Sequence, residues 1–99
     1  MKELTSKDRY NLSRISKTIN PVIWVGKNGM TEQVLTAVDE LLAKKELIKI
    51  KFVNLKDEKK TISEEISDRT KSCLVRIIGN TAIFYRMSED PEKRSIVLD

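Results

Sequence analysis

The connection that decides the fold lies in residues 22–31, which read VIWVGKNGMT. A short apolar run is followed by a loop bounded by Gly26 and Gly29, and a helical pattern opens at Thr31. Asn-Gly is a strong signal for a β-hairpin, but a hairpin needs a second strand after its turn. Instead, apolar residues recur at three- and four-residue spacing through residues 31–42, which predicts a helix. We therefore expect a strand, a tight glycine loop and a helix, in that order.

This loop has the chemistry of a phosphate site. Gly26 and Gly29 allow the backbone to approach a ligand closely, and the positive end of the following helix dipole points at the same place. Lys27 adds a mobile positive charge at the same place. Thr31 is expected to cap the helix. The alternative is a connection that only turns the chain from strand to helix.

Composition and charge indicate which kind of partner such a loop could bind. The chain has 99 residues, with 19 Lys and Arg against 15 Asp and Glu and a formal net charge of +4. This length suits one domain with one core, and the charge favours a polyanionic partner. The basic residues are concentrated in residues 1–31 and 44–60, whereas residues 32–43 carry three acids and no base. Two basic stretches are therefore available to bind a polyanion.

Other classes of function lack the residues they need. There is no histidine and a single cysteine, Cys73, which argues against a Cys/His zinc site and an intramolecular disulfide. The pairs Asp57-Glu58 and Glu64-Glu65 lie in polar stretches without a nucleophile and base to complete a mechanism. We expect no enzyme activity, no metal, no cofactor and no small-molecule substrate, and we expect Cys73 to be a buried hydrophobe. No run resembles a membrane span or signal sequence, so a cytoplasmic protein is expected. We also expect a monomer.

Periodicity along the chain predicts the element order α-β-α-β-α-β-β. A first helix opens near Thr5 and ends before Pro21, and a third, weaker helix follows residue 60. Strands are expected at residues 22–25, 48–53, 74–78 and 82–85, with Gly79-Asn80 joining the last two as a hairpin. Helix–strand alternation implies parallel pairing, and the hairpin implies an antiparallel pair. The expected fold is a single small α/β domain whose four-stranded mixed sheet has helices packed on it.

Three expectations concern burial. The run at residues 22–25 does not alternate between apolar and polar residues, which is typical of a strand covered on both faces. Trp24 and Tyr85 lie in predicted strands, so core packing is favoured over base stacking for both. The charged tail from residue 87 is expected to add little to the core.

Basic residues outside the loop are candidates for the same surface. Lys49 and Lys51 alternate with apolar residues and share one strand face, about 7 Å apart, while a plain solvated face is the equal alternative. Arg9, Arg14 and Lys17 could extend the basic surface from the first helix, although a charged outer face is ordinary for a helix.

Three blocks in this order, residues 20–32, 46–51 and 78–86, closely resemble the bacterial YhbY-type proteins. These are the single-domain members of the CRM (chloroplast RNA splicing and ribosome maturation) family. The resemblance implies a fold similar to the C-terminal domain of translation initiation factor three, with a KH-like GxxG loop that contacts RNA backbone. It divides the chain into a CRM domain, residues 1–86, and a tail, residues 87–99. It also implies a non-catalytic protein that binds large-subunit ribosomal RNA precursors in pre-ribosomal particles and assists ribosome assembly.

The resemblance adds Arg86, which belongs to the family's Tyr-Arg ending and is expected to anchor the fold or contact RNA. Family members often carry a basic residue where this chain has Asn80, which puts a phosphate contact there in doubt. The expected RNA-binding residues are Gly26, Lys27, Asn28, Gly29, Lys49, Lys51, Arg14, Lys17 and Arg86. The alternative function is a protein-interaction subunit that a partner protein recruits to the ribosome or another RNA complex.

Overall fold

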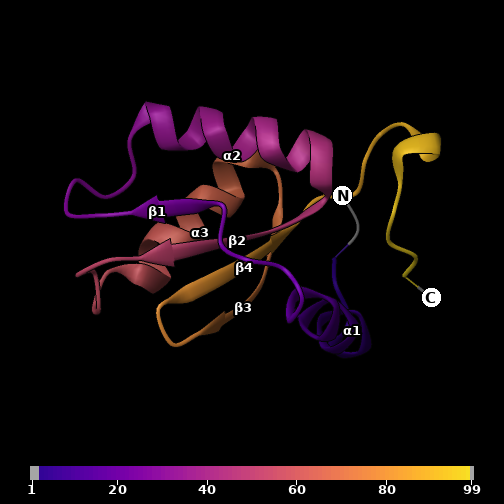
Figure 1. The fold of residues 1–99 in the computed structure, drawn as a ribbon, viewed down its shortest axis with the longest axis horizontal. Helices are drawn as coiled ribbons and strands as arrows, with labels where there is room; N and C mark the ends of the chain where they lie inside the picture. The colour runs from indigo at the N-terminus through magenta and orange to yellow at the C-terminus, as the bar shows by residue number, and fades with distance from the viewer. Residues whose placement is uncertain (1–2, 99) are drawn as a thin grey trace.

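The computed structural model describes residues 3–98 and has the predicted order of elements (Figure 1). Residues 1, 2 and 99, which fall within the expected ranges 1–86 and 87–99, lie outside the described residues. The helices are α1 (Ser6–Ser16), α2 (Glu32–Lys45) and α3 (Lys59–Thr70), with a 3-10 turn η1 (Pro91–Lys93) in the tail. The strands are β1 (Ile23–Val25), β2 (Leu47–Phe52), β3 (Cys73–Ile78) and β4 (Thr81–Tyr85).

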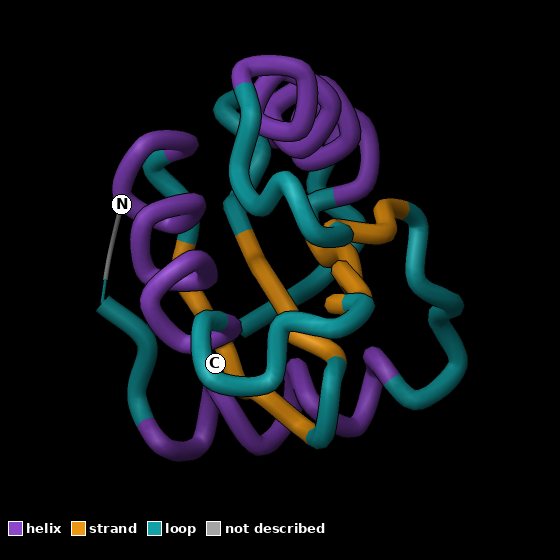
Figure 2. The backbone as a smooth tube through the Cα atoms, turned by 90° about the vertical axis from the view of Figure 1, so that its left-hand side faces the viewer, coloured by secondary structure: helices purple, strands orange, loops and turns teal. Residues whose placement is uncertain are grey.

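The four strands form one mixed sheet in the order β1-β2-β4-β3. Strand β1 pairs parallel to β2 through the α2 crossover, and β4 pairs antiparallel to both β2 and β3. The predicted mixed sheet is therefore confirmed. Three connections meet at what we call the loop end of the sheet: residues 26–29, 53–58 and 79–80 (Figure 1). At the opposite end, which we call the tail end, β4 finishes and the C-terminal segment begins (Figure 1). Figure 2 shows the backbone from the loop end, with α2 at the top.

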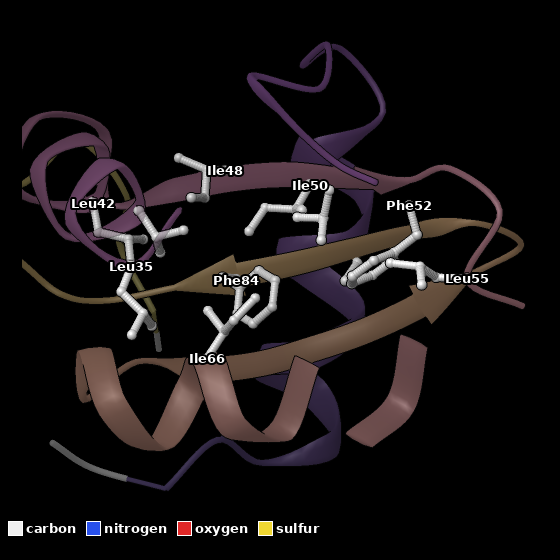
Figure 3. Close-up of a cluster of buried hydrophobic side chains, with 11 residues drawn as sticks. Leu35, Leu42, Ile48, Ile50, Phe52, Leu55, Ile66 and Phe84 are labelled. Carbon is white, nitrogen blue, oxygen red and sulfur yellow. The ribbon is translucent and has the colours of Figure 1, made fainter. Parts of the chain in front are cut away.

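One face of the sheet packs against α2 and α3. Alternate residues of β2, Ile48, Ile50 and Phe52, are buried there, as the period-two pattern predicted. They meet Leu42 from α2 and Ile66 from α3 in the larger hydrophobic cluster (Figure 3). This cluster fixes α2, and therefore fixes the loop that precedes it.

Helix α1 covers part of the other face, at the tail end. Its Leu12 is fully buried in a second cluster with Leu47 and Tyr85, so the predicted core position of Tyr85 is confirmed. A shift in the β3–β4 register follows Leu74, and the Arg9 guanidinium donates to the Leu74 and Val75 carbonyls at 2.5 and 2.9 Å. A register shift disrupts the ladder locally, and Arg9 supplies hydrogen-bond donors to carbonyls at this point. This contact holds α1 to β3.

The C-terminal segment packs onto the domain, so the expectation that it adds little to the core is wrong. Ile96 and Leu98 are partly buried against the second cluster. The carboxylate of Glu46, only 1% exposed, accepts hydrogen bonds from the backbone N–H groups of Ser88 at 2.6 Å, Ser95 at 2.8 Å and Ile96 at 3.3 Å. A charged residue at the end of a helix normally faces water. Here it is buried because the segment folds back over it.

Candidate nucleic-acid interface

The glycine loop forms a tight turn directly after β1. The Gly29 N–H donates to the Gly26 carbonyl at 2.8 Å, which closes the turn. Gly29 has a φ of +66°, a backbone conformation that glycine adopts without a steric penalty. Gly26 has no positive φ, and a Cβ placed on it would have no heavy atom within 4 Å. The fold therefore requires glycine at 29, whereas nothing within the described chain requires it at 26.

The tip of the loop presents its donors to solvent. Lys27 and Asn28 are exposed, and their backbone N–H groups have no acceptor among residues 3–98. The Thr31 hydroxyl accepts the Val34 N–H at 3.2 Å, so the predicted cap at the start of α2 is confirmed. Unpaired N–H groups beside a helix N-terminus form a region of positive potential. The loop has the geometry for an anion and is not buried by its own chain.

Lys51 lies next to the loop, because it pairs with Trp24 across the parallel β1–β2 ladder. Lys49 occupies the same face of β2 and is partly buried, whereas Lys51 is exposed. The prediction that the two lysines share a face is confirmed. Since β1 ends at the glycine loop, Lys51 extends the positive surface from the loop onto the sheet.

Trp24 is 59% exposed, so the expectation that it packs in the core is wrong. The expectation that both faces of residues 22–25 are covered is wrong for the same reason. Strand β1 is an edge strand, and α1 packs over the tail end of this face around Leu47 and Tyr85. The face near the loop therefore remains open. The apolar sequence of the strand carries no sign of this, because it depends on where α1 lies.

Sequence reasoning missed Lys59, the first residue of α3. Its ammonium donates to the carbonyl of Gly79 in the β3–β4 turn. Lys59 thus brings a positive charge beside the turn that contains Asn80. The only signal in the sequence was the run of lysines in residues 56–60. The contact joins residues 20 positions apart, so the spacing of charges alone could not reveal it.

The structure does not bring Arg9, Arg14, Lys17 or Arg86 to the loop. Arg9 is held by its contacts with the Leu74 and Val75 carbonyls. Arg14 is exposed on α1, where its guanidinium lies 5.9 Å from the centre of the Tyr10 ring, and Lys17 is exposed at the C-cap of this helix. Arg86 lies at the tail end, because β4 finishes there at Tyr85, opposite the first residue of β2. It forms a 2.7 Å ion pair with Asp39, and it also donates to the Asp39 and Thr70 carbonyls.

Arg86 therefore ties the middle of α2 to the end of α3, which is the anchoring half of its expected role. RNA contact by Arg86 stays a prediction.

Cys73 and Tyr85 have raised pKa values, and both residues lie outside this surface. Burial raises the pKa of the Cys73 thiol, and burial followed by the nearby Glu46 carboxylate raises the pKa of the Tyr85 phenol. Cys73 is half-buried against the second cluster. Within residues 3–98 no three His, Cys, Asp or Glu side chains gather as metal ligands would. Over the same residues, no helix has the length and apolar character needed to cross a membrane.

The fold and the loop together define a class of small α/β domains that present a GxxG turn at one end of a mixed sheet. The model of the CRS1 / YhbY (CRM) domain family matches residues 4–86. The chain belongs to this family.

Relatives of similar size support the assignment. The chain is 35% identical over 91 residues to a Haemophilus influenzae protein named "RNA-binding protein", covering 91% of this chain and 92% of the relative. It is 31% identical over 88 residues to "Probable RNA-binding protein YqeI" of Bacillus subtilis, covering 88% and 92%. The solution structure of the hypothetical protein SAV1595 from Staphylococcus aureus superposes with a TM-score of 0.81 at 31% identity, over 96% of this chain and 100% of that chain.

Proposed function

We propose that this chain is a non-catalytic RNA-binding protein that holds RNA backbone at the loop end of its sheet. The loop Gly26–Gly29 binds a phosphate of the RNA, and Lys27 and Asn28 contact that phosphate. Lys51 binds the next part of the RNA backbone. Family membership and the names of the relatives support RNA as the polyanion.

The observation that carries the proposal is the open space at Gly26. A glycine whose φ is not positive and whose Cβ would touch nothing contributes little that alanine would not. What glycine provides at position 26 is room for a ligand to approach the backbone, close to the unpaired N–H groups of Lys27 and Asn28. A phosphodiester fits this combination of close approach, N–H donors and positive charge.

We further propose that the RNA is a precursor of the large ribosomal subunit and that the protein assists assembly of pre-ribosomal particles in the cytoplasm as a monomer. The resemblance of residues 20–32, 46–51 and 78–86 to the YhbY-type proteins supports this finer assignment. Crosslinking in cells, sequencing of the attached RNA and fractionation of ribosomal particles provide its test. Reads on large-subunit RNA and protein in precursor particles are expected, and reads spread over unrelated RNAs would contradict the assignment.

The loop is tested by the double variant Lys27→Asp with Asn28→Asp. Two carboxylates would face phosphate in place of a lysine and an amide, so RNA binding should be lost in a gel-shift titration. The melting temperature should be preserved, because both side chains are exposed.

The matched control is Ser6→Asp with Lys7→Asp, two exposed residues at the start of α1. It makes the same change in net charge, and carboxylates are favourable at a helix N-terminus. We expect this control to retain most of its RNA affinity. Equal losses in the two variants would mean that overall charge, and not the loop, drives binding. If RNA association is unchanged in the loop variant and is also independent of salt concentration, recruitment by a partner protein would be favoured.

A further inference from the structure

We propose that the uncovered row of the sheet beside the loop is a platform for unpaired RNA bases, on which Trp24 stacks a base. The row contains one residue from each strand: Trp24, Lys51, Thr81 and Ile78. The inference rests on the proposed function and specifies its substrate class, namely single-stranded RNA segments.

The pairing register places the four side chains of this row on one face. Trp24 is opposite Lys51, Lys51 is opposite Thr81, and Thr81 is opposite Ile78. Directly paired residues point to the same side of a sheet. The adjacent positions Ile50 and Phe52 are buried against α2 and α3, so the row faces the opposite way, toward the side of α1.

Helix α1 leaves this row open. It buries Leu47 and Tyr85 at the tail end and Ile83 in the middle of the face. Trp24 is nevertheless 59% exposed and Ile78 is 54% exposed. Trp24 and Ile78 therefore expose apolar side chains at the two ends of a row that no element of residues 3–98 covers, with Lys51 and Thr81 between them.

The charges around the row are complementary to the negative phosphates of a nucleic acid. The strands carry Lys49, Lys51 and Arg76 and contain no acidic residue. Arg76 is paired with Ile83, so it lies on the same face as Lys51, two residues before Ile78 in β3. An aromatic side chain with basic neighbours is the arrangement that binds single strands, because bases stack while phosphates are neutralised. A purely apolar protein partner would leave these basic side chains without counter-charges.

The row also continues the phosphate site. Trp24 is separated from Gly26 by Val25 alone. A nucleotide whose phosphate lies in the loop can therefore place its base toward Trp24. The row spans three strand spacings, about 14 Å, which leaves room for a following nucleotide over Lys51 and Ile78. Bases within a duplex are stacked on one another and cannot lie flat on such a surface.

Trp24 is the only tryptophan of the chain, so its fluorescence reports on the platform directly. The full chain is titrated with a single-stranded oligonucleotide, with an abasic oligonucleotide that has the same number of phosphates, and with a duplex of the same length. We expect strong quenching by the single strand and little by the other two. Saturable binding of the single strand without quenching, or equal quenching by the abasic strand, would overturn the proposal. This measurement needs no variant and is independent of any change in stability.

Substitutions separate stacking from apolar contact. Trp24→Leu keeps an apolar side chain without an aromatic face and should weaken single-strand binding at least about fivefold, while Trp24→Phe should lose less. Duplex affinity should change little in either variant. Tyr10→Leu is the matched control, because Tyr10 is 62% exposed but lies on α1, outside the row. An equal loss in Tyr10→Leu, or no loss in Trp24→Leu, would overturn the proposal.

The outcomes also separate this inference from the proposed function. If Trp24→Leu binds all RNAs normally while Lys27→Asp with Asn28→Asp binds none, the platform fails and the loop stands. If the parent chain binds no RNA, both fail. If sedimentation finds that the parent is a dimer and Trp24→Leu is a monomer, the row is an interface between two copies and the platform fails.

Discussion

At the scale of single residues, Gly26 and Gly29 bound the same loop for different physical reasons. Gly29 has a φ of +66° and lies 3.8 Å, measured from an added Cβ, from the Ile62 side chain of α3. Its identity follows from backbone geometry. Gly26 has open space around it and an ordinary φ, so its identity is explained by what approaches from outside. The two glycines should therefore respond to substitution in opposite ways.

Gly29→Ala should lower the free energy of unfolding by about 1–2 kcal/mol, because a side chain is strained at positive φ. Gly26→Ala should leave stability unchanged or slightly raised, because alanine restricts the unfolded chain, yet it should weaken RNA binding. Denaturant melts and gel shifts on both variants measure the two effects. Gly26→Ala with normal RNA affinity would contradict close approach of the ligand at this residue.

At the scale of elements, the end of α2 and the C-terminal segment stabilise one another through Glu46. The residue closes α2 with a positive φ of 54°, and its carbonyl accepts the Arg86 N–H at 2.8 Å. Its buried carboxylate binds backbone N–H groups of Ser88, Ser95 and Ile96. Hydrogen bonds to a charged acceptor are stronger than those between neutral groups. The segment after β4 is thus part of the fold, with Glu46 as its main polar attachment.

Glu46→Gln should lower the free energy of unfolding by about 1.5–3 kcal/mol, since it removes the charge from these hydrogen bonds and adds an amide donor among N–H groups. Glu40→Gln is the matched control, because Glu40 is exposed on the same helix. RNA affinity should be unchanged in both variants, since the loop is at the other end of the sheet. Equal stability of the two variants in a thermal melt would mean that Glu46 does not hold the segment.

At the scale of the whole molecule, the two ends of the sheet have separate tasks. The tail end carries the burial of Glu46, the Arg86 anchor and the cluster beneath α1. The loop end carries the exposed donors of residues 27 and 28 and the open face of the sheet. Stability and binding are therefore controlled by different residues. Basic residues outside the loop end, although they contribute to the net charge of +4, need not touch the RNA.

Salt dependence can locate the bound RNA on this surface. Each phosphate contact that is removed should reduce the slope of log affinity against log salt by roughly 0.7–0.9, equally for all RNA sequences. We expect this reduction for Lys51→Ala and for Lys49→Ala, and twice that for the double variant. Lys17→Ala on α1 is the comparison, because it removes the same charge from a surface away from the loop. A parental slope in Lys51→Ala would limit the site to the loop, and a reduced slope in Lys17→Ala would extend it to α1.

The sequence by itself determined the order of elements and the chemistry of the loop. Apolar periodicity, the caps at Thr5 and Thr31 and the turn at Gly79-Asn80 are local signals, and the structure bears them out. The alternation in β2 also fixed which of its residues are buried and put Lys49 and Lys51 on one face. These features follow from contacts between residues near one another in the chain, or from the two-residue period of a strand.

Only the tertiary structure decided the exposure of Trp24, the separation of Arg86 from the loop and the burial of Glu46. Trp24 is open because β1 is an edge strand and α1 covers the far end of its face. Arg86 is distant because β4 runs antiparallel to β2 and ends at the tail end. Glu46 is buried by residues 42 to 50 positions later in the chain. Whether a side chain meets water depends on which distant element packs against it, and the local pattern of residues does not contain that information.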